Sequence, residues 1–181
     1  MSLATLDDLE QLCGPQDDAA AAQSALDQAT TAIQMATGQT LIAMESRVLL
    51  DGEGADTLLL PELPVTDVAT VRVEGIELDE YDFEWSATGI LRLTGWCRHF
   101  PRRMQSVDVT YSHGFDPIPA DLVLATAKIA CRILAGGEVT GATIDGVPIT
   151  HERVGAYSVS YNQGLSATES AVVDRYRVLW P

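Results

Sequence analysis

Three histidines and three cysteines are the residues of this sequence best suited to metal binding or nucleophilic chemistry; they are His99, His113, His151, Cys13, Cys97 and Cys131. Cys97 and His99 are one residue apart and could supply two ligands to zinc, but no second pair follows at a zinc-site spacing. No serine stands in a Gly-x-Ser-x-Gly motif, so a Ser-His-Asp triad has no support. These residues predict neither a metal centre nor a hydrolase.

Acidic pairs and glycines complete the set of residues that could do chemistry. Two of the three acidic pairs, Asp7-Asp8 and Asp17-Asp18, stand at expected helix starts, where the helix dipole favours negative charge. Asp79-Glu80 is the third pair. The glycines of residues 136–146 lack the lysine of a phosphate loop and the spacing of a dinucleotide site. We therefore expect no catalytic residue, no metal and no cofactor.

The cysteines are odd in number and have no short spacing between them. A disulfide framework normally uses an even set of cysteines at regular spacings in a secreted chain. We expect three reduced thiols, partly buried, and synthesis in the cytosol.

Charge is distributed unevenly along this acidic chain, whose net charge is −15. The first 67 residues hold twelve acids and one base, and Lys128 is the only lysine in the sequence. Wrapping of nucleic acid needs clustered lysine and arginine, so a duplex-binding protein is not indicated. No apolar run approaches the roughly 18 residues of a membrane-spanning helix, and no membrane partner is expected.

Two clusters have the composition of contact surfaces. The first, here the basic patch, comprises Arg98, Arg102 and Arg103; it contacts an acidic protein surface or is a solvated loop. The second is the C-terminal segment with Arg175, Tyr176, Arg177, Leu179 and Trp180. Arg, Tyr and Trp are enriched at interface hot spots, although a terminal Trp can also pack on its own domain.

Helix signals at the two ends of the chain predict the elements that must position these clusters. Residues 6–13 follow the capping residue Thr5, and residues 17–37 form an alanine-rich helix that ends at Gly38. Residues 119–135 predict a long helix, apolar nearly all round, as in a core helix or one under a subunit interface. Its narrow polar strip holds only Asp121, Lys128 and Arg132. The last helix begins at Ser166, whose capping-box partner is Glu169.

Between these helices the hydrophobic period changes to two. Residues 46–112 predict several short strands in a small, mostly antiparallel sheet or barrel, with a hairpin at residues 51–54. Tyr157, Val159 and Tyr161 alternate with serines as a further strand. At 181 residues we expect a single domain of α+β class. Its predicted parts are a helical region (1–38), a β-rich insertion (45–112), a core helix (118–136), a Gly-rich loop or arm (136–147), and a strand with a C-terminal helix (147–181).

The order of these parts resembles the head–tail connector (adaptor) proteins of long-tailed bacteriophages. Four stretches carry the resemblance: the acidic start at residues 4–9, the Val-x-Val-x-Tyr strand running into Gly114-Phe115, residues 118–122 at the start of the apolar helix, and residues 152–161 followed by Tyr176-Arg177. The β-rich insertion is larger than in the smallest connectors, whose fold is mainly helical.

The resemblance implies a structural virion protein without catalytic residues, made in the bacterial cytoplasm and placed at the head–tail junction. It implies a ring of about twelve copies that joins the portal to tail-side neck (stopper) proteins. DNA passes through its channel during packaging and ejection without specific binding. It also assigns the C-terminal segment to portal contact. Tyr157, Val159, Tyr161 and the basic patch are expected to contact a neighbouring subunit or the portal.

Two alternatives remain open from the sequence. Another neck component, a head-completion stopper or tail terminator, would share the ring role, although the long apolar helix after a β region favours the connector. A small ligand-binding or hydrolase domain would need a pocket with convergent polar groups, which the sequence does not display.

Overall fold

A computed structural model describes residues 2–95, 99–135, 143–144, 147–148, 151–154, 157–160 and 165–177. Its contacts divide the chain into two compact units. The helical unit comprises Met1–Gly38 with Ile118–Pro181, and the β unit comprises Gln39–Pro117. The expectation of one domain stays a prediction, because compact units in one chain need not fold separately.

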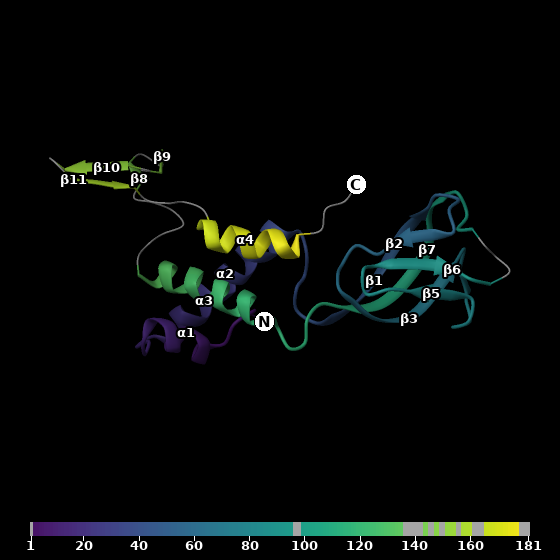
Figure 1. The fold of residues 1–181 in the computed structure, drawn as a ribbon, viewed down its shortest axis with the longest axis horizontal. Coiled ribbons are helices and arrows are strands. Elements are labelled where there is room, and N and C mark those ends of the chain that lie inside the picture. The colour runs from purple at the N-terminus through teal and green to yellow at the C-terminus, as the bar shows by residue number, and fades with distance from the viewer. Residues whose placement is uncertain are drawn as a thin grey trace. The chain divides into compact units, whose positions relative to one another are not determined.

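Four helices form the helical unit: α1 (Leu6–Cys13), α2 (Ala19–Thr37), α3 (Ala120–Leu134) and α4 (Ala167–Tyr176) (Figure 1). Local signals explain their starts. Thr5 and Asp8 form a capping box on α1, and the Asp18 side chain accepts hydrogen bonds from the first turn of α2. Gly38 ends α2 in the left-handed conformation that glycine adopts without strain. The predicted helices are therefore confirmed, with boundaries that differ by at most two residues.

Small residues bring α2 and α3 together in the core of the helical unit. The buried alanines of α2 alternate with Leu26 and Ile33, and α3 contributes Leu122 and Ile129 to the same core. Alanine lets two helix backbones approach closely, so the packing consists of a few large side chains between small ones. The expectation that residues 119–135 form a core helix is confirmed for α3.

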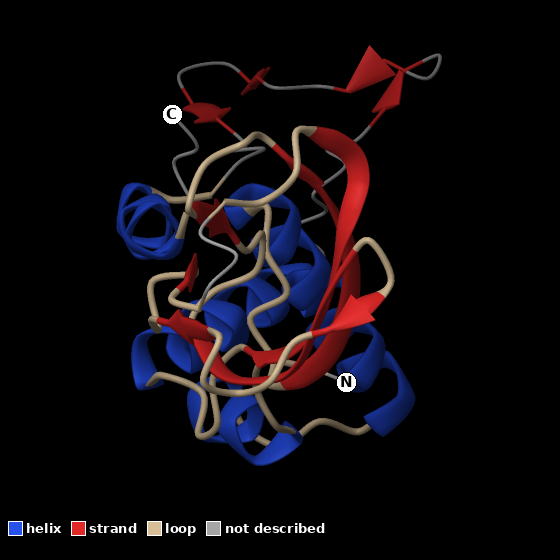
Figure 2. Ribbon diagram, turned by 90° about the vertical axis from the view of Figure 1, so that its right-hand side faces the viewer, coloured by secondary structure: helices blue, strands red, loops and turns tan. Residues whose placement is uncertain are grey.

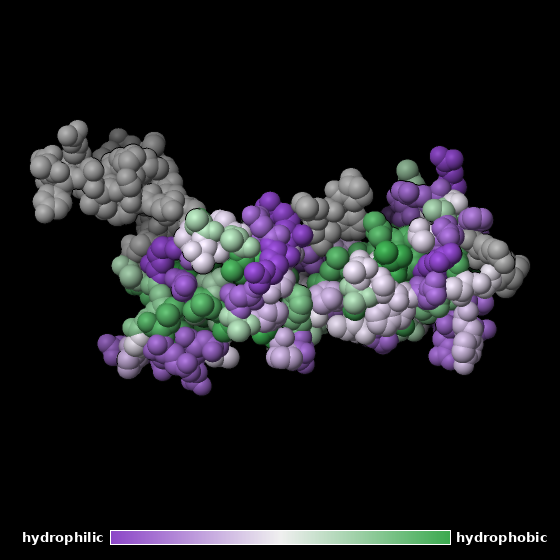
Figure 3. Space-filling view, viewed as in Figure 1, coloured by the Kyte–Doolittle hydropathy of each residue, from purple (hydrophilic) through white to green (hydrophobic). Residues whose placement is uncertain are grey.

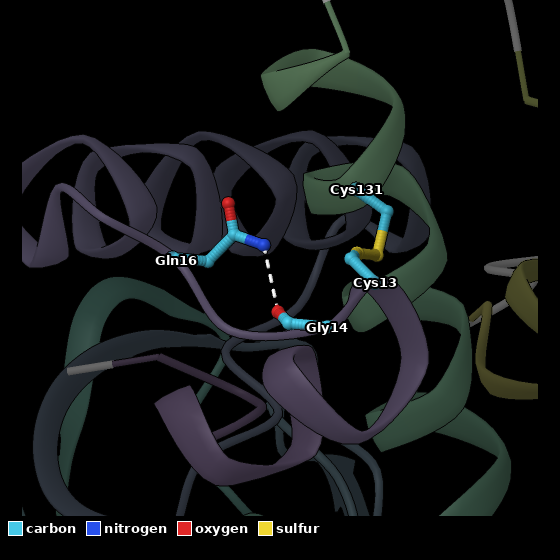
Figure 4. Close-up of a disulfide and its surroundings, with 4 residues drawn as sticks. All are labelled: Cys13, Gly14, Gln16 and Cys131. Atoms are coloured by element: carbon cyan, nitrogen blue, oxygen red, sulfur yellow. Dashed lines mark hydrogen bonds between the residues drawn. A yellow bond between two sulfur atoms is a disulfide. The ribbon is translucent and has the colours of Figure 1, made fainter.

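A disulfide joins Cys13, at the end of α1, to Cys131 near the end of α3 (Figure 4). Directly after α1, on the way to α2, the chain turns at Gly14, whose carbonyl accepts a hydrogen bond from the Gln16 side chain at 2.8 Å. The expectation of three reduced thiols is therefore corrected for two of them. The two cysteines lie 118 residues apart, so only the folded helices bring them together.

The β unit contains two antiparallel sheets. One has the strand order β1-β7-β3-β4, and its strands are β1 (Met44–Gly52), β7 (Arg103–His113), β3 (Val65–Val73) and β4 (Ile76–Glu77). The other has the order β2-β6-β5, with β2 (Thr57–Leu59), β6 (Ile90–Leu93) and β5 (Phe83–Trp85). The long strands of this unit are strongly curved (Figure 2). The mixed α+β class with an antiparallel β region is confirmed.

Pairing in the β unit differs from the sequence expectation at one point. Residues 51–54 were expected to form a hairpin, but the two strands that they connect belong to different sheets, because β1 pairs with β7 and β2 pairs with β6. The turn residues here therefore transfer the chain from one sheet to the other. One buried cluster fills the space that the sheets enclose; it includes Val71, Leu91, Phe100, Val107 and Tyr111.

Two short ribbons follow α3 in sequence. Strands β8 (Thr143–Ile144) and β9 (Val147–Pro148) pair with each other, as do β10 (His151–Val154) and β11 (Tyr157–Ser160). The strand predicted from Tyr157 is thus confirmed as β11. Most of the expected Gly-rich arm, residues 136–147, lies outside the described residues. Of the helices that the structure describes, none is long and apolar enough to cross a membrane.

Candidate functional site

The C-terminal helix α4 is fastened to α3 by a buried ion pair. Glu169 accepts two hydrogen bonds from Arg132, at 3.1 and 3.0 Å, and a third from the Ser166 backbone at 2.7 Å. Burial alone would raise the pKa of Glu169, but the hydrogen bonds from Arg132 and Ser166 outweigh it and lower that pKa. The Ser166–Glu169 capping box predicted from sequence is present, and its acid also binds the neighbouring helix.

Asp121 at the start of α3 is the second attachment point of α4. Its carboxylate accepts hydrogen bonds from Arg175, at 2.8 Å, and from the Tyr176 hydroxyl, at 2.7 Å. The pKa of Tyr176 is raised, mainly by burial and then by the hydrogen bond to Asp121 and the charge of Asp121. Its hydroxyl therefore stays protonated and donates. The structure therefore brings two predicted portal-contact residues together, on a partner within their own unit.

Arg177 directly after α4 forms the third contact. Its guanidinium donates two hydrogen bonds to the Ala36 carbonyl near the end of α2, at 3.2 and 3.1 Å. Cationic donors at a helix C-terminus satisfy carbonyls that have no partner within the helix. Leu179 and Trp180, the other two predicted portal-contact residues, lie outside the described residues.

The basic patch belongs to the β unit. Arg103 begins β7 and lies 3.4 Å from the carboxylate of Glu74. Arg102 is exposed, and its Cβ faces Gly54 of the loop that follows β1. Arg98 lies outside the described residues. The patch thus consists, as far as the structure describes it, of two neighbouring exposed arginines, of which one is already paired.

His113 is the buried histidine of the β unit. Its Nε2 lies 2.8 Å from the Ser46 hydroxyl, but Nδ1 has no hydrogen bond of good geometry and no carboxylate orients the ring. Burial lowers the pKa of His113, against the opposing effects of Glu62 and the Thr40 backbone. A catalytic triad needs an acid at Nδ1 and an accessible nucleophile, so this pair is a core hydrogen bond.

Metal-ligand geometry is absent from the part of the chain that the structure describes, where no three His, Cys, Asp or Glu side chains converge. His99 is exposed and lines a shallow hollow of about 470 Å³ with Asp56, Glu84 and Arg92. Arg92 lies 3.4 Å from Asp56 and 3.6 Å from Glu84, so its single positive charge offsets part of the negative charge of the two carboxylates. Cys97, the proposed partner of His99, is outside the described residues.

The predicted contact strand is the second strand of the β10–β11 ribbon. In its register Tyr157 is opposite Val154 and Val159 is opposite Glu152. A ribbon of two strands is marginally stable on its own, and its contact with another surface stays a prediction. Tyr161 lies beyond the described part of the ribbon.

Sequence reasoning missed the partners of α4. It placed Asp121 and Arg132 on one polar strip of the core helix and assigned Glu169 to a cap, but it did not pair them. That strip was the available signal, because a polar strip on an otherwise apolar helix needs a polar neighbour when another helix covers it.

The architecture is that of solved structures from phage-like particles. The chain matches "Neck of empty GTA particle computed with C6 symmetry" with 21% identity and a TM-score of 0.61, covering 97% of this chain and 88% of that chain. It matches "Neck of native GTA particle computed with C12 symmetry" with 19% identity and a TM-score of 0.62, covering 97% and 89%. A third match is the virion of a native gene transfer agent (GTA) particle, at 19% identity, a TM-score of 0.61 and coverage of 97% and 89%. At these identities the likeness establishes the fold.

The sequence itself identifies the family. Residues 1–131 match the model of the head completion protein family, and the chain belongs to that family. No curated protein sequence matches it. The family and the structural neighbours are structural virion proteins, not enzymes, which confirms the expected kinship with head–tail proteins of phage-like particles.

Proposed function

We propose that this protein forms a ring of about twelve copies in the neck of a phage-like particle, between the portal and the tail-side neck proteins, with DNA passing through the channel. The supporting observation is the match of nearly the whole fold to a neck computed with C12 symmetry. Membership of the head completion family agrees with it. In this proposal the protein is made and assembled in the host cytoplasm and remains at the head–tail junction of the virion.

Cryo-electron microscopy of the particle tests the ring. The expected result is cyclic density in the neck into which the helical and β units fit as separate bodies. Native mass spectrometry of the purified protein, alone and with portal, gives the copy number. Density for this chain at the tail tip, or one copy per particle, would contradict the proposal.

The portal contact is proposed for the residues after α4. Arg175 and Tyr176 are bound to Asp121, so they hold α4 in place, whereas Leu179 and Trp180 follow the helix. Trp and Arg are among the residues most enriched at hot spots, and Trp180 follows Arg177 by three residues. The β10–β11 ribbon, with Tyr157 and Val159, is proposed to contact a neighbouring subunit or the portal in the same ring.

Deletion of residues 178–181 tests the portal contact more sharply than removal of the whole α4. Removing α4 would also remove Glu169 and leave Arg132 without its partner. We expect the short deletion to abolish portal binding while the melting temperature is unchanged. Trp180→Ala should weaken binding, and Trp85→Ala, in the β unit, is the matched control that should not. Unchanged portal binding by the deletion would refute the assignment.

A further inference from the structure

Two apolar surfaces lie on the helical unit, and its own helices cover neither. The first, here the α2–α3 groove, is a hollow of about 740 Å³ along α2. Ile129 and Ile133 of α3 line it together with Ala32 and Met35 of α2; Ile129 is itself a core residue, 2% exposed, so the exposed part of the groove belongs mainly to α2. Met35 is 80% exposed at this hollow, and apolar side chains gathered at an exposed hollow are typical of an interaction site.

The second surface, here the α1–α3 patch, centres on Leu12 and Leu124, which are 44% and 46% exposed. They border a shallower hollow of about 470 Å³ together with Ile118 and Val123. Figure 3 shows hydrophobic surface gathered over α1 and α3. At the rim of this hollow Leu12 and Leu124 are exposed, and these two leucine side chains are the groups suited to enter an apolar groove.

The two surfaces use different faces of α3. At 3.6 residues per turn, Ile129 and Ile133 point about 150° away from the mean direction of the α3 residues in the patch. One copy therefore presents two different apolar surfaces in two directions. Such a pair suits a heterologous contact, in which the patch of one copy meets the groove of the next, and heterologous contacts generate closed rings when the rotation between copies closes. A twofold dimer would need only one self-complementary surface.

Unpaired charges beside the two surfaces are complementary. Lys128 is exposed one helical turn from Leu124, and within the described residues it has no ion pair. Asp27 is exposed and lines the α2–α3 groove; its carboxylate accepts a hydrogen bond from Gln23 at 3.1 Å and meets no basic side chain in the described part of the chain. The only lysine of the sequence thus flanks the α1–α3 patch, and an unpaired acid flanks the groove.

We propose that the α1–α3 patch of one copy docks in the α2–α3 groove of the adjacent copy, with Lys128 facing Asp27 of that copy. The occupant of the groove is thus a second molecule of this chain. This inference rests on the proposed ring and specifies its subunit contact.

A charge-swap experiment in assembled particles tests the contact. The producing strain lacks its own gene and is complemented with wild type, Lys128→Asp, Asp27→Lys or the double variant. Asp17→Lys is the control, because Asp17 is exposed in the same unit, does not line the groove, and its reversal changes the charge by the same amount. Quantitative mass spectrometry counts copies per purified particle, and thermal melting of each purified variant checks folding.

We expect each single reversal to lower the copies per particle at least about tenfold, because like charges facing each other across an interface are strongly unfavourable. The double variant should restore incorporation, and Asp17→Lys should match wild type. All variants should melt as wild type does. Met35→Glu, which places a charge in the groove, should also fail to assemble.

The outcomes separate this inference from the proposed function. Normal incorporation of both single reversals, with a cyclic neck ring still present, would overturn the contact and leave the ring intact. A double variant as defective as its parents would also overturn the pairing of Lys128 with Asp27. Absence of any cyclic arrangement in wild-type particles would refute the proposed ring itself.

Discussion

Glu169 is the one acidic residue among the described positions that the fold buries, with 3% of its surface exposed. A carboxylate in this position is stable only while Arg132 and the capping-box hydrogen bonds neutralise it. Because Arg132 remains partly exposed, its guanidinium can regain some hydration when the pair is broken.

Glu169→Gln should therefore destabilise the protein by about 1–3 kcal/mol, since the neutral amide removes the charge that faces Arg132 and presents a donor to another donor. Thermal or urea unfolding measures the change. Asp174→Asn on the same helix is the matched control: its side chain is 67% exposed and 3.8 Å from Arg177, so we expect at most about 0.5 kcal/mol. Equal effects of the two substitutions would contradict the importance of the buried pair.

The same pair predicts a pH dependence. The folded-state pKa of Glu169 is lowered, so its stabilisation is fully present above the unfolded pKa of about 4.3 and is lost as the pH falls through the folded value. The difference in melting temperature between wild type and Glu169→Gln should be largest near neutral pH and should shrink below about pH 4. A difference that grows in acid would show that another group causes it.

Gly114 fixes the end of β7 in the β unit. Its φ is +94°, and a Cβ there would lie 2.5 Å from the Ile42 carbonyl oxygen, which is backbone and cannot rotate away. The neighbouring Phe115 bridges to Ile42 in parallel. A methyl group would therefore force this bridge apart.

Gly114→Ala should destabilise the protein by about 2–4 kcal/mol, combining left-handed strain with the steric clash. Gly75→Ala is the matched control: its φ is +83° and nothing lies within 4 Å of its added Cβ. There we expect a loss of only about 1 kcal/mol, because alanine must adopt the left-handed backbone conformation but meets no steric clash. Urea unfolding of both variants distinguishes the two costs, and equal losses would show that the approach to Ile42 is not limiting.

The disulfide between α1 and α3 should stabilise the helical unit against unfolding. The loop that it closes, with a separation of 118 residues, restricts the unfolded chain. In the chain-entropy account a loop of this length contributes roughly 4–5 kcal/mol, and measured values are usually smaller. Reductant should therefore lower the melting temperature of the oxidised protein. The double variant Cys13→Ser/Cys131→Ser should not respond to reductant, whereas Cys97→Ser should respond as wild type does. An unchanged melting temperature of the wild-type protein in reductant would contradict this stabilising role of the disulfide.

Local signals explain which elements could be predicted from the sequence. Thr5 and Ser166 mark helix starts through hydrogen bonds within four residues, so α1 and α4 were correctly located. Strand partners are not local: β1 pairs with β7, more than 50 residues later, and the turn after β1 resembles a hairpin whichever sheet follows. The disulfide escaped prediction for the same reason, because no spacing rule links Cys13 to Cys131.

The contact surfaces were predicted from their residue types, and the positions of those residues in the fold support the prediction only in part. Arg175 and Tyr176 have the residue types of an interface, and the structure gives both a partner in Asp121 of their own unit. Residue type indicates that a side chain forms polar contacts, but it does not show whether those contacts are within the same chain or with another protein. The apolar character of α3, by contrast, indicated a core helix or one under an interface, and the helix has a buried side and, around Leu124, one partly exposed apolar side.

Most of the positive charge on the described part of the molecule is already paired. Seven arginines lie within 4 Å of a carboxylate: Arg47, Arg72, Arg92, Arg103, Arg132, Arg175 and Arg177. A chain of net charge −15, with most of the arginines in its described part paired, repels the phosphate backbone. Repulsion of this kind suits a channel through which DNA must slide without being held.

We therefore expect no measurable duplex binding by the purified protein, even at low salt, where screening is weakest. Fluorescence anisotropy with labelled duplex DNA at several salt concentrations measures the binding.

Arg102 and Arg103 are proposed to contact protein and not DNA. Reversing both to Glu should therefore reduce incorporation into particles and leave the melting temperature near that of wild type. Tight, salt-sensitive DNA binding by wild type that disappears in this double variant would show instead that the basic patch contacts phosphates. The channel of the proposed ring would then hold DNA through the few cations that its acidic surface leaves exposed.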